Sequence, residues 1–305
     1  MDIDPSRFEK EYADSLNSLA HAQWEAGQRN EALESSQACL PICRQLAREN
    51  PDEHKPKLAN ALNSISVNLA ETGQPSKAMP ASRESVDIYR QLAEQYPDKF
   101  RPYLANSLNN LSIRHATLGQ HKEAMQASRE SVDIRRQLAE QYPDKFRPDL
   151  ATSLNNLSAF HATLGQHKEA MQASRESVDI YRQLAEQYPD KFRPYLANSL
   201  NNLSIRHATL GQHKEAMQAS RESVDIRRQL AEQYPDKFRP DLANSLGLTS
   251  ETLQQLDRPD EALAAVRQGL EIIAPYAQDN PRGWPGQVQA RLQAQLQRLQ
   301  PNPDH

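Results

Sequence analysis

Large apolar side chains recur at helical spacing over residues 104–118. The stripe consists of Leu104, Leu108, Leu111, His115 and Leu118. Side chains three and four residues apart share one face of an α-helix, so the segment is predicted to be helical. Pro102 suits the first turn of that helix, and Gly119 suits the left-handed conformation that ends many helices. We name this predicted element helix A.

A second stripe predicts a partner, helix B, which begins near 120–122 and ends at about Tyr142. Its members are Ala124, Ser128, Ser131, Leu138 and Tyr142. The Ala and Ser side chains are small enough to let two helix backbones approach closely. Pro143 is predicted to end helix B, and residues 143–147 are predicted to form a loop that leads to the next helix A.

The whole pattern repeats along the chain every 46 residues. The prolines that mark the period are Pro56, Pro102, Pro148, Pro194 and Pro240. A fixed period of this size indicates supersecondary units that stack on one another, because neither helix can bury its apolar stripe alone. We predict an all-α fold, a right-handed α-solenoid of six antiparallel helix pairs plus a C-terminal capping helix.

The repeats are predicted to form one domain over residues 1–299 of this 305-residue chain. Their predicted bounds are about 10–55, 56–101, 102–147, 148–193, 194–239 and 240–285. The sixth repeat departs most from the others, with Gly247 and Thr249 in helix A and Asp257 at the turn glycine. Residues 287–299 are predicted to form the capping helix, and 300–305 a disordered tail.

The repeat resembles the tetratricopeptide repeat. The residues that carry the likeness are Leu108, Leu111, Gly119, Ala124, Ser128 and Ser131. The resemblance covers residues 10 to about 280. His115 stands where the family usually has an aromatic residue and Ser112 where it usually has glycine, and the period of 46 exceeds the family's usual length of about 34. Such long repeats resemble the arrays found in bacterial proteins.

The resemblance implies that the face of helix A opposite the apolar stripe lines an inner groove. Candidate binding residues on that face and its shoulder are Asn60, Asn63, Asn106, Asn109, Asn110, Arg114, Asn155, Asn156, Asn198, Asn201, Asn202 and Arg206. Asparagine offers both donors and acceptors, so a ladder of amides can hydrogen-bond an extended peptide backbone. In the alternative interpretation, these amides bond only to one another and to water, and stabilise the stack.

These observations predict a protein–protein interaction scaffold whose partner is a protein or peptide that the sequence does not identify. The alternative is a structural array that associates with copies of itself. The chain is expected to be a monomer or a weak homo-oligomer, and a measurement of mass at several concentrations separates the two hypotheses.

No catalytic motif stands out from the array. The sequence has no glycine-rich phosphate loop, no nucleophile elbow and no zinc motif. The acidic, serine and histidine residues recur with the repeat, whereas an active site normally needs one unrepeated set. We therefore expect no enzyme activity and no cofactor. The repeated histidines, such as His115 and His121, lack partner carboxylates at ligand spacing, so no metal site is predicted.

The net charge of −4 favours neither nucleic acid nor an anionic membrane as a partner. No apolar run approaches the roughly 18–20 residues of a membrane helix, and the N-terminal residues do not resemble a signal peptide. A cytoplasmic location is therefore expected. Cys39 and Cys43 lie one helical turn apart and are interpreted as small packing residues.

Two positions 14 residues apart vary together among the repeats. The pairs are Tyr89 with Tyr103, Arg135 with Asp149, Tyr181 with Tyr195, and Arg227 with Asp241. Tyrosine with tyrosine can stack, and arginine with aspartate can form an ion pair. We predict that the two positions meet where helix B of one repeat approaches helix A of the next.

Overall fold

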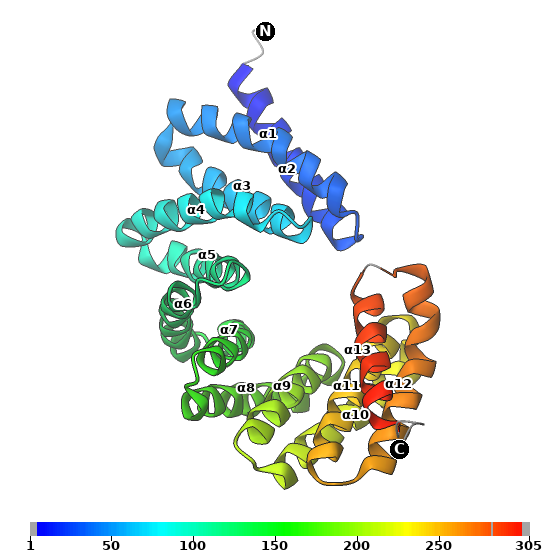
Figure 1. The fold of residues 1–305 in the computed structure, drawn as a ribbon. Coiled ribbons are helices and arrows are strands. Elements are labelled where there is room, and N and C mark those ends of the chain that lie inside the picture. The colour runs from blue at the N-terminus through cyan, green and yellow to red at the C-terminus, as the bar shows by residue number, and fades with distance from the viewer. Residues whose placement is uncertain (1–4, 282, 301–305) are drawn as a thin grey trace. The chain divides into compact units, whose positions relative to one another are not determined.

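A computed structural model describes residues 5–281 and 283–300 of the chain, and its described elements are all helices. Figure 1 shows them in order, from α1 near the N-terminus to α13 near the C-terminus. Their bounds are α1 Pro5–Glu25, α2 Arg29–Glu49, α3 Pro51–Glu71, α4 Pro75–Gln95, α5 Pro97–Thr117, α6 His121–Gln141, α7 Pro143–Thr163, α8 His167–Gln187, α9 Pro189–Thr209, α10 His213–Gln233, α11 Pro235–Gln255, α12 Pro259–Asp279 and α13 Trp284–Leu299.

The predicted helix pairs are confirmed. The odd-numbered helices from α1 to α11 are helix A of each repeat, and the even-numbered helices are helix B. The turn glycine after each helix A is left-handed, as at Gly119, where φ is 72°. A side chain at this φ is strained, which explains the glycine. In the sixth repeat the strained position is taken by Asp257, with φ of 55°.

The predicted loop at 143–147 is wrong, because this segment forms the first turns of α7. Pro143 is the first residue of helix A rather than a stop signal, and Tyr142 alone links the two helices. Pro102, predicted in a first turn, likewise lies inside α5, which begins at Pro97. Phe100 is buried in the first turns of α5, and its burial stabilises the helix ahead of Pro102. Each structural repeat therefore starts about five residues before the predicted boundary.

Contacts between Cα atoms divide the chain into two units, residues 1–160 and 161–305, with the boundary inside α7. Within each unit, consecutive helices pack in the manner of a solenoid, as α3, α4 and α5 do in the first unit and α9, α10 and α11 in the second. Successive A helices also pack directly, such as α3 on α5. One continuous domain over 1–299 stays a prediction.

A column of small buried residues on the B helices holds the helix layers together. The Ser131 hydroxyl of α6 donates to the carbonyl oxygen of Ala105 in α5 over 2.7 Å, and Ser85 and Ser223 make the same bond in other repeats. In the first repeat the thiol of Cys39 takes this place, with 3.4 Å between Cys39 Sγ and the carbonyl oxygen of Ala13. Cys39 therefore fills a repeated packing position.

The capping helix is α13, which begins three residues before the predicted start and packs on α11 and α12. Leu292 is fully buried there. A Cβ atom at Gly247 would lie 2.9 Å from Leu292 Cδ2, and one at Gly269 would lie 3.1 Å from Leu292 Cδ1. The two glycines therefore make room for the cap, which explains two departures of the last repeat. Of the predicted tail, residues 301–305 lie outside the described residues.

The predicted pairing across repeats is confirmed. The rings of Tyr89 and Tyr103 stack with centroids 5.6 Å apart, and the rings of Tyr181 and Tyr195 repeat this geometry. In the variant form, the guanidinium of Arg227 donates to the carboxylate of Asp241. Arg135 instead reaches the backbone carbonyl oxygen of Asp149, at 3.0 Å.

We expect Asp241→Ala to lower the free energy of unfolding by about 3 kcal/mol, because it leaves the guanidinium of Arg227 without its carboxylate. The Arg227 side chain is only 2% exposed, and its burial already lowers its pKa from the ordinary value. Asp225→Ala is the control, since Asp225 pairs with Arg228 on the surface and its loss should change stability by less than about 1 kcal/mol. Equal losses of stability in urea denaturation would contradict this assignment.

Candidate protein-binding surface

The helix A face opposite the apolar stripe is the surface that the sequence proposed for binding. Asn106 of α5, Asn60 of α3 and Asn198 of α9 are exposed on it. Five further candidate asparagines are partly buried: Asn63, Asn110, Asn155, Asn156 and Asn202. Asn109 and Asn201 are buried between the layers. The candidates therefore occupy three depths, and their chemistry differs with depth.

Amides of neighbouring A helices bond to each other in the first unit. Asn110 Nδ2 of α5 donates to Asn63 Oδ1 of α3 over 3.0 Å. Asn156 Nδ2 of α7 donates to Asn109 Oδ1 of α5, also over 3.0 Å. These bonds join one repeat to the next, as the structural interpretation of the asparagines expects. An amide with one bond still has further donor and acceptor capacity.

In the second unit the amides bond to other partners. Asn201 Nδ2 of α9 donates to Ser245 Oγ of α11 over 2.9 Å. Asn198 accepts a hydrogen bond from Arg227 of α10. At the cap, Arg291 of α13 donates to Asn244 of α11, so α13 occupies the place of a further helix A. The amide row thus contributes to the stacking of successive repeats in both units.

Arg114 and Arg206 are basic side chains at equivalent positions of α5 and α9. Arg114 is 6% exposed, and its guanidinium makes no hydrogen bond or ion pair within the described residues. Burial lowers the pKa of Arg114 from its ordinary value, and the charge of Glu71 opposes that shift. Burial lowers the pKa of Arg206 as well. Arg114 is buried and Arg206 partly buried, and neither forms an ion pair within the described residues, so both positions favour an anion.

In other repeats, the residue at the position of Arg114 is uncharged. In α3 it is Asn68, whose Nδ2 donates to the carbonyl oxygen of Ala32 and to Ser36 Oγ. In α7 it is Phe160, which is buried. A satisfied polar residue or an apolar one therefore fits the layer, which makes the unpaired guanidiniums of Arg114 and Arg206 the exception.

The repeated histidines of helix A are buried, as their place on the stripe predicts. His115, His161 and His207 each bond through Nδ1 to the glutamine that follows the turn glycine, as in the 2.6 Å contact of His115 with Gln120 Oε1. In the parts of the chain that the structure describes, no three His, Cys, Asp or Glu side chains gather as metal ligands would.

Sequence reasoning missed a second surface, formed by the B helices. Grooves lie between consecutive B helices, with helix A between them as the floor. One groove lies between α4 and α6 and has a volume of about 310 Å³. Another lies between α10 and α12 and has a volume of about 710 Å³. The sequence contains no signal for such grooves, because a groove depends on the distance between helices.

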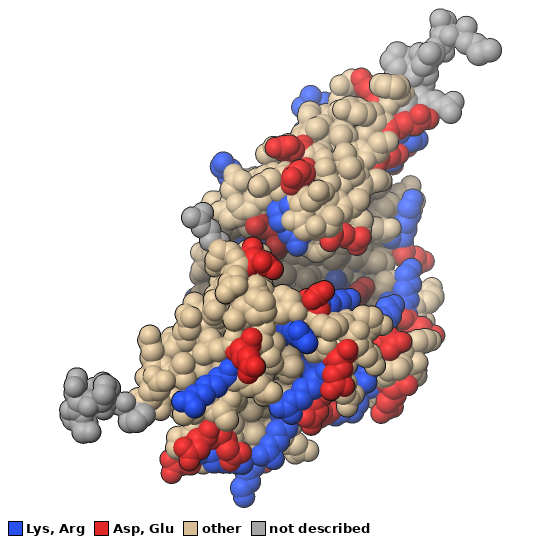
Figure 2. Space-filling view, turned by 90° about the vertical axis from the view of Figure 1, so that its right-hand side faces the viewer, with Lys and Arg blue, Asp and Glu red and all other residues tan. Residues whose placement is uncertain are grey.

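Charges of both signs are interspersed on the surface in Figure 2, without a large patch of one sign. This distribution agrees with the nearly balanced composition of 36 basic and 40 acidic residues. Selectivity for a charged partner must therefore come from individual sites rather than from a broad field.

A sequence model of the family described as "Tetratricopeptide repeat" matches residues 13–52, 104–144, 150–189 and 196–236, more than half of the chain. The chain belongs to the tetratricopeptide repeat family. Proteins of this family generally act as scaffolds for protein–protein interaction and are typically not enzymes. A search of curated proteins found no match to the sequence.

Solved structures share the fold of this tetratricopeptide repeat protein. BtubC (BKLC) from P. vanneervenii superposes with a TM-score of 0.62 at 18% identity, over 90% of this chain and 94% of that one. A putative kinesin light chain from Podosopora anserina has a TM-score of 0.55 at 21% identity, over 77% of this chain and 99% of that one. A STAND protein with a tetratricopeptide repeat sensor from Pyrococcus horikoshii has a TM-score of 0.63 at 13% identity, over 95% of this chain and 40% of that one.

No helix within the described ranges combines the length and the apolar character needed to cross a bilayer. The helices are instead amphipathic, with charged side chains on their outer faces, as α6 is with its exposed Arg129 and Glu140.

We expect Arg114→Met to keep the fold and to raise the free energy of unfolding by about 1 kcal/mol. An apolar side chain of similar length removes an unpaired buried charge and keeps the packing of the stem. Thermal and urea unfolding with far-ultraviolet circular dichroism measure the effect. A loss of stability would show that the guanidinium already has a stabilising partner in the free protein.

Proposed function

We propose that the chain is a scaffold that binds an extended segment of a partner protein along the exposed face of its A helices, and that the segment carries acidic side chains. The observation that carries this proposal is the buried side chain of Arg114, whose guanidinium makes no ion pair and no hydrogen bond within the described residues. A carboxylate of the partner would neutralise that charge in a partly desolvated place, where an ion pair is strongest.

The amide row supports the same proposal through the partner's backbone. Asn60 and Asn106 are exposed and make no hydrogen bond within the described residues, so their donors and acceptors face solvent. Asn63 and Asn110 are already bonded to each other, which fixes the direction in which their remaining donors and acceptors point. A preorganised row of amides loses little conformational entropy when it bonds a peptide backbone.

The second unit supplies a related set, in which Arg206 is partly buried and Asn198 already accepts a hydrogen bond from Arg227. Arg206 takes the place of Arg114, and Asn198 and Asn202 take the places of Asn106 and Asn110. We include Asn155 of α7 and the buried Asn109 and Asn201 in the proposed site because they support the exposed amides of the A helices. The partner's identity is not part of the proposal.

We propose further that the protein acts by binding alone, without catalysis, and in the cytoplasm. Cys39 and Cys43 occupy buried packing positions one helical turn apart, where a disulfide would join a helix to itself and constrain little, so the fold is suited to a compartment in which cysteines stay reduced. Exposed Asn and buried Arg side chains are groups for recognition rather than for proton transfer or nucleophilic attack at neutral pH.

A display library of short random segments, selected on the full chain, tests the proposal. We expect the selected segments to be enriched in Asp and Glu, and we expect Arg114→Met to weaken their binding at least about 30-fold, the effect of losing one desolvated charge pair. Asn106→Ala should weaken binding less. Fluorescence anisotropy with the purified segments measures both affinities.

Lys122→Met is the matched control, because it also removes one positive charge, from an exposed position on α6. Its affinity should stay close to that of the unchanged protein. If Arg114→Met and Lys122→Met bind the selected segments equally well, the helix A face is not the binding surface.

A further inference from the structure

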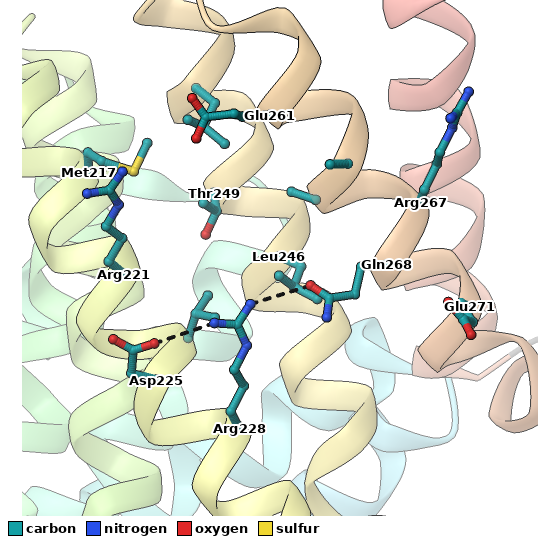
Figure 3. Close-up of a pocket in the computed structure, with 14 residues that line it drawn as sticks. Met217, Arg221, Asp225, Arg228, Leu246, Thr249, Glu261, Arg267, Gln268 and Glu271 are labelled. Atoms are coloured by element: carbon teal, nitrogen blue, oxygen red, sulfur yellow. Dashed lines mark hydrogen bonds and ion pairs between the residues drawn. The ribbon is translucent and has the colours of Figure 1, made fainter.

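We propose that the groove between α10 and α12 is a second binding site, and that its ligand is a short amphipathic acidic helix of a partner protein. This site lies on the B helices, so it is separate from the helix A face. Figure 3 shows the groove, with side chains from α10, α11 and α12 around it.

Between three other pairs of consecutive B helices, an ion pair bridges the two helices. Arg90 Nη2 of α4 lies 3.0 Å from both carboxylate oxygens of Glu130 in α6. Arg182 of α8 bonds Glu222 of α10 at 2.9 Å, and Arg44 of α2 pairs with Glu84 of α4 at 2.5 Å. In each pair the arginine precedes its glutamate by 40 residues. We call this repeated pair the bridge.

The bridge lacks its carboxylate at α10 and α12. The arginine is Arg228, but the residue 40 positions later is Gln268, and the contact between them is 3.5 Å long. Arg228 also lies 3.6 Å from Asp225 on its own helix, and its side chain is 48% exposed. This arginine therefore retains donors that a carboxylate from outside could use, in the way that Glu130 uses those of Arg90.

The groove is also wider than its counterpart. Compared with the groove between α4 and α6, Ala264 replaces Gln126 and Thr249 replaces Leu111 in the lining. The volume is about 710 Å³ instead of about 310 Å³. The substitutions remove side chains from the rim and from the floor, and Gln268 removes the bridge across the top. Two neighbouring helices thus carry three changes at the same space, Thr249 on α11 and Ala264 and Gln268 on α12.

The lining determines the chemistry of the ligand. The apolar part consists of the floor residues Met217, Val224, Leu246 and Leu253, which are only 2–5% exposed, and of the more exposed Ala264 and Ala265 on α12. The groove extends along α10 from Met217 to Arg228, about three helical turns. A helix that places apolar side chains at i, i+3, i+4 and i+7 covers a floor of this length.

Charge complementarity selects an acidic helix. Arg221 makes no ion pair within the described residues, and Arg228 has only its weak pair with Asp225. The acidic Glu261 on the opposite rim is already paired with Arg258, at 2.5 Å. The lining carries three arginines (Arg221, Arg228, Arg267) and three acids (Asp225, Glu261, Glu271), and because Glu261 is already paired with Arg258, its arginines outnumber the acids that remain to neutralise them.

Synthetic helical peptides with leucine at i, i+3, i+4 and i+7 are the probe. One set carries glutamate at the remaining positions and a matched set carries glutamine. With the full chain, we expect the glutamate set to bind at least about tenfold more tightly than the glutamine set in fluorescence anisotropy, and to protect α10 and α12 from hydrogen exchange. Equal affinity of the two sets, or no binding by either, would overturn the proposal.

The decisive variant is Ala264→Gln with Gln268→Glu, which restores the two residues that α6 has at these positions. Because α6 folds with these residues, the variant should keep the helical content and the unfolding midpoint. We expect it to bind the glutamate set at least about tenfold less tightly, while Lys122→Met, which removes a surface charge outside the groove, binds it with unchanged affinity. Unchanged affinity of the double variant, with its fold intact, contradicts a site in this groove, whereas a loss confined to Arg114→Met places the peptides on the helix A face.

Discussion

The distance between the helix layers depends on one column of small residues along the B helices. Ser85, Ser131 and Ser223 each donate a hydrogen bond to a carbonyl oxygen of the preceding helix A, and each is fully buried. Cys39 and Gly269 occupy the same position in the first and last repeats. A larger side chain there would push the two helices apart, because a close-packed interior has no space to receive it.

The other features of the structure follow from this close approach. Since α5 lies against α3, the amides of Asn110 and Asn63 are close enough to bond to each other. The A helices α3 and α5 pack directly on each other, whereas the B helices α4 and α6 are joined by long side chains, as Arg90 joins Glu130. Two kinds of surface result, a row of amides on the A helices and grooves between the B helices, and we propose both as binding surfaces. Both can vary by substitution without a change in the scaffold.

The sequence was sufficient for the fold because the repeat shows the same pattern several times. It also predicted the contact of Tyr89 with Tyr103, since matched variation between repeats reveals neighbours. The prediction failed at the start of helix A, where Pro143 was interpreted as the end of helix B. Pro143 instead begins α7, and the burial of Phe146 stabilises the first turns of that helix. The depth of the asparagines could not be predicted, because Asn109 and Asn110 are adjacent in sequence and only the packing of the next helix distinguishes them.

Hydrogen exchange measured residue by residue on Ser131→Ile and Ser131→Ala tests the close approach of the layers most directly. Ser131→Ala keeps the small volume and loses one hydrogen bond. The free energy of opening of α5 and α6 should therefore fall by about 1 kcal/mol, and their amides should exchange faster. Ser131→Ile adds volume where the packing leaves no space. It should lower the free energy of opening of α5 and α6 by about 3 kcal/mol more than Ser131→Ala does, with a smaller effect on α11 and α12. If α5 and α6 are protected from exchange equally in Ser131→Ile and Ser131→Ala, the small residues do not set the distance between the layers.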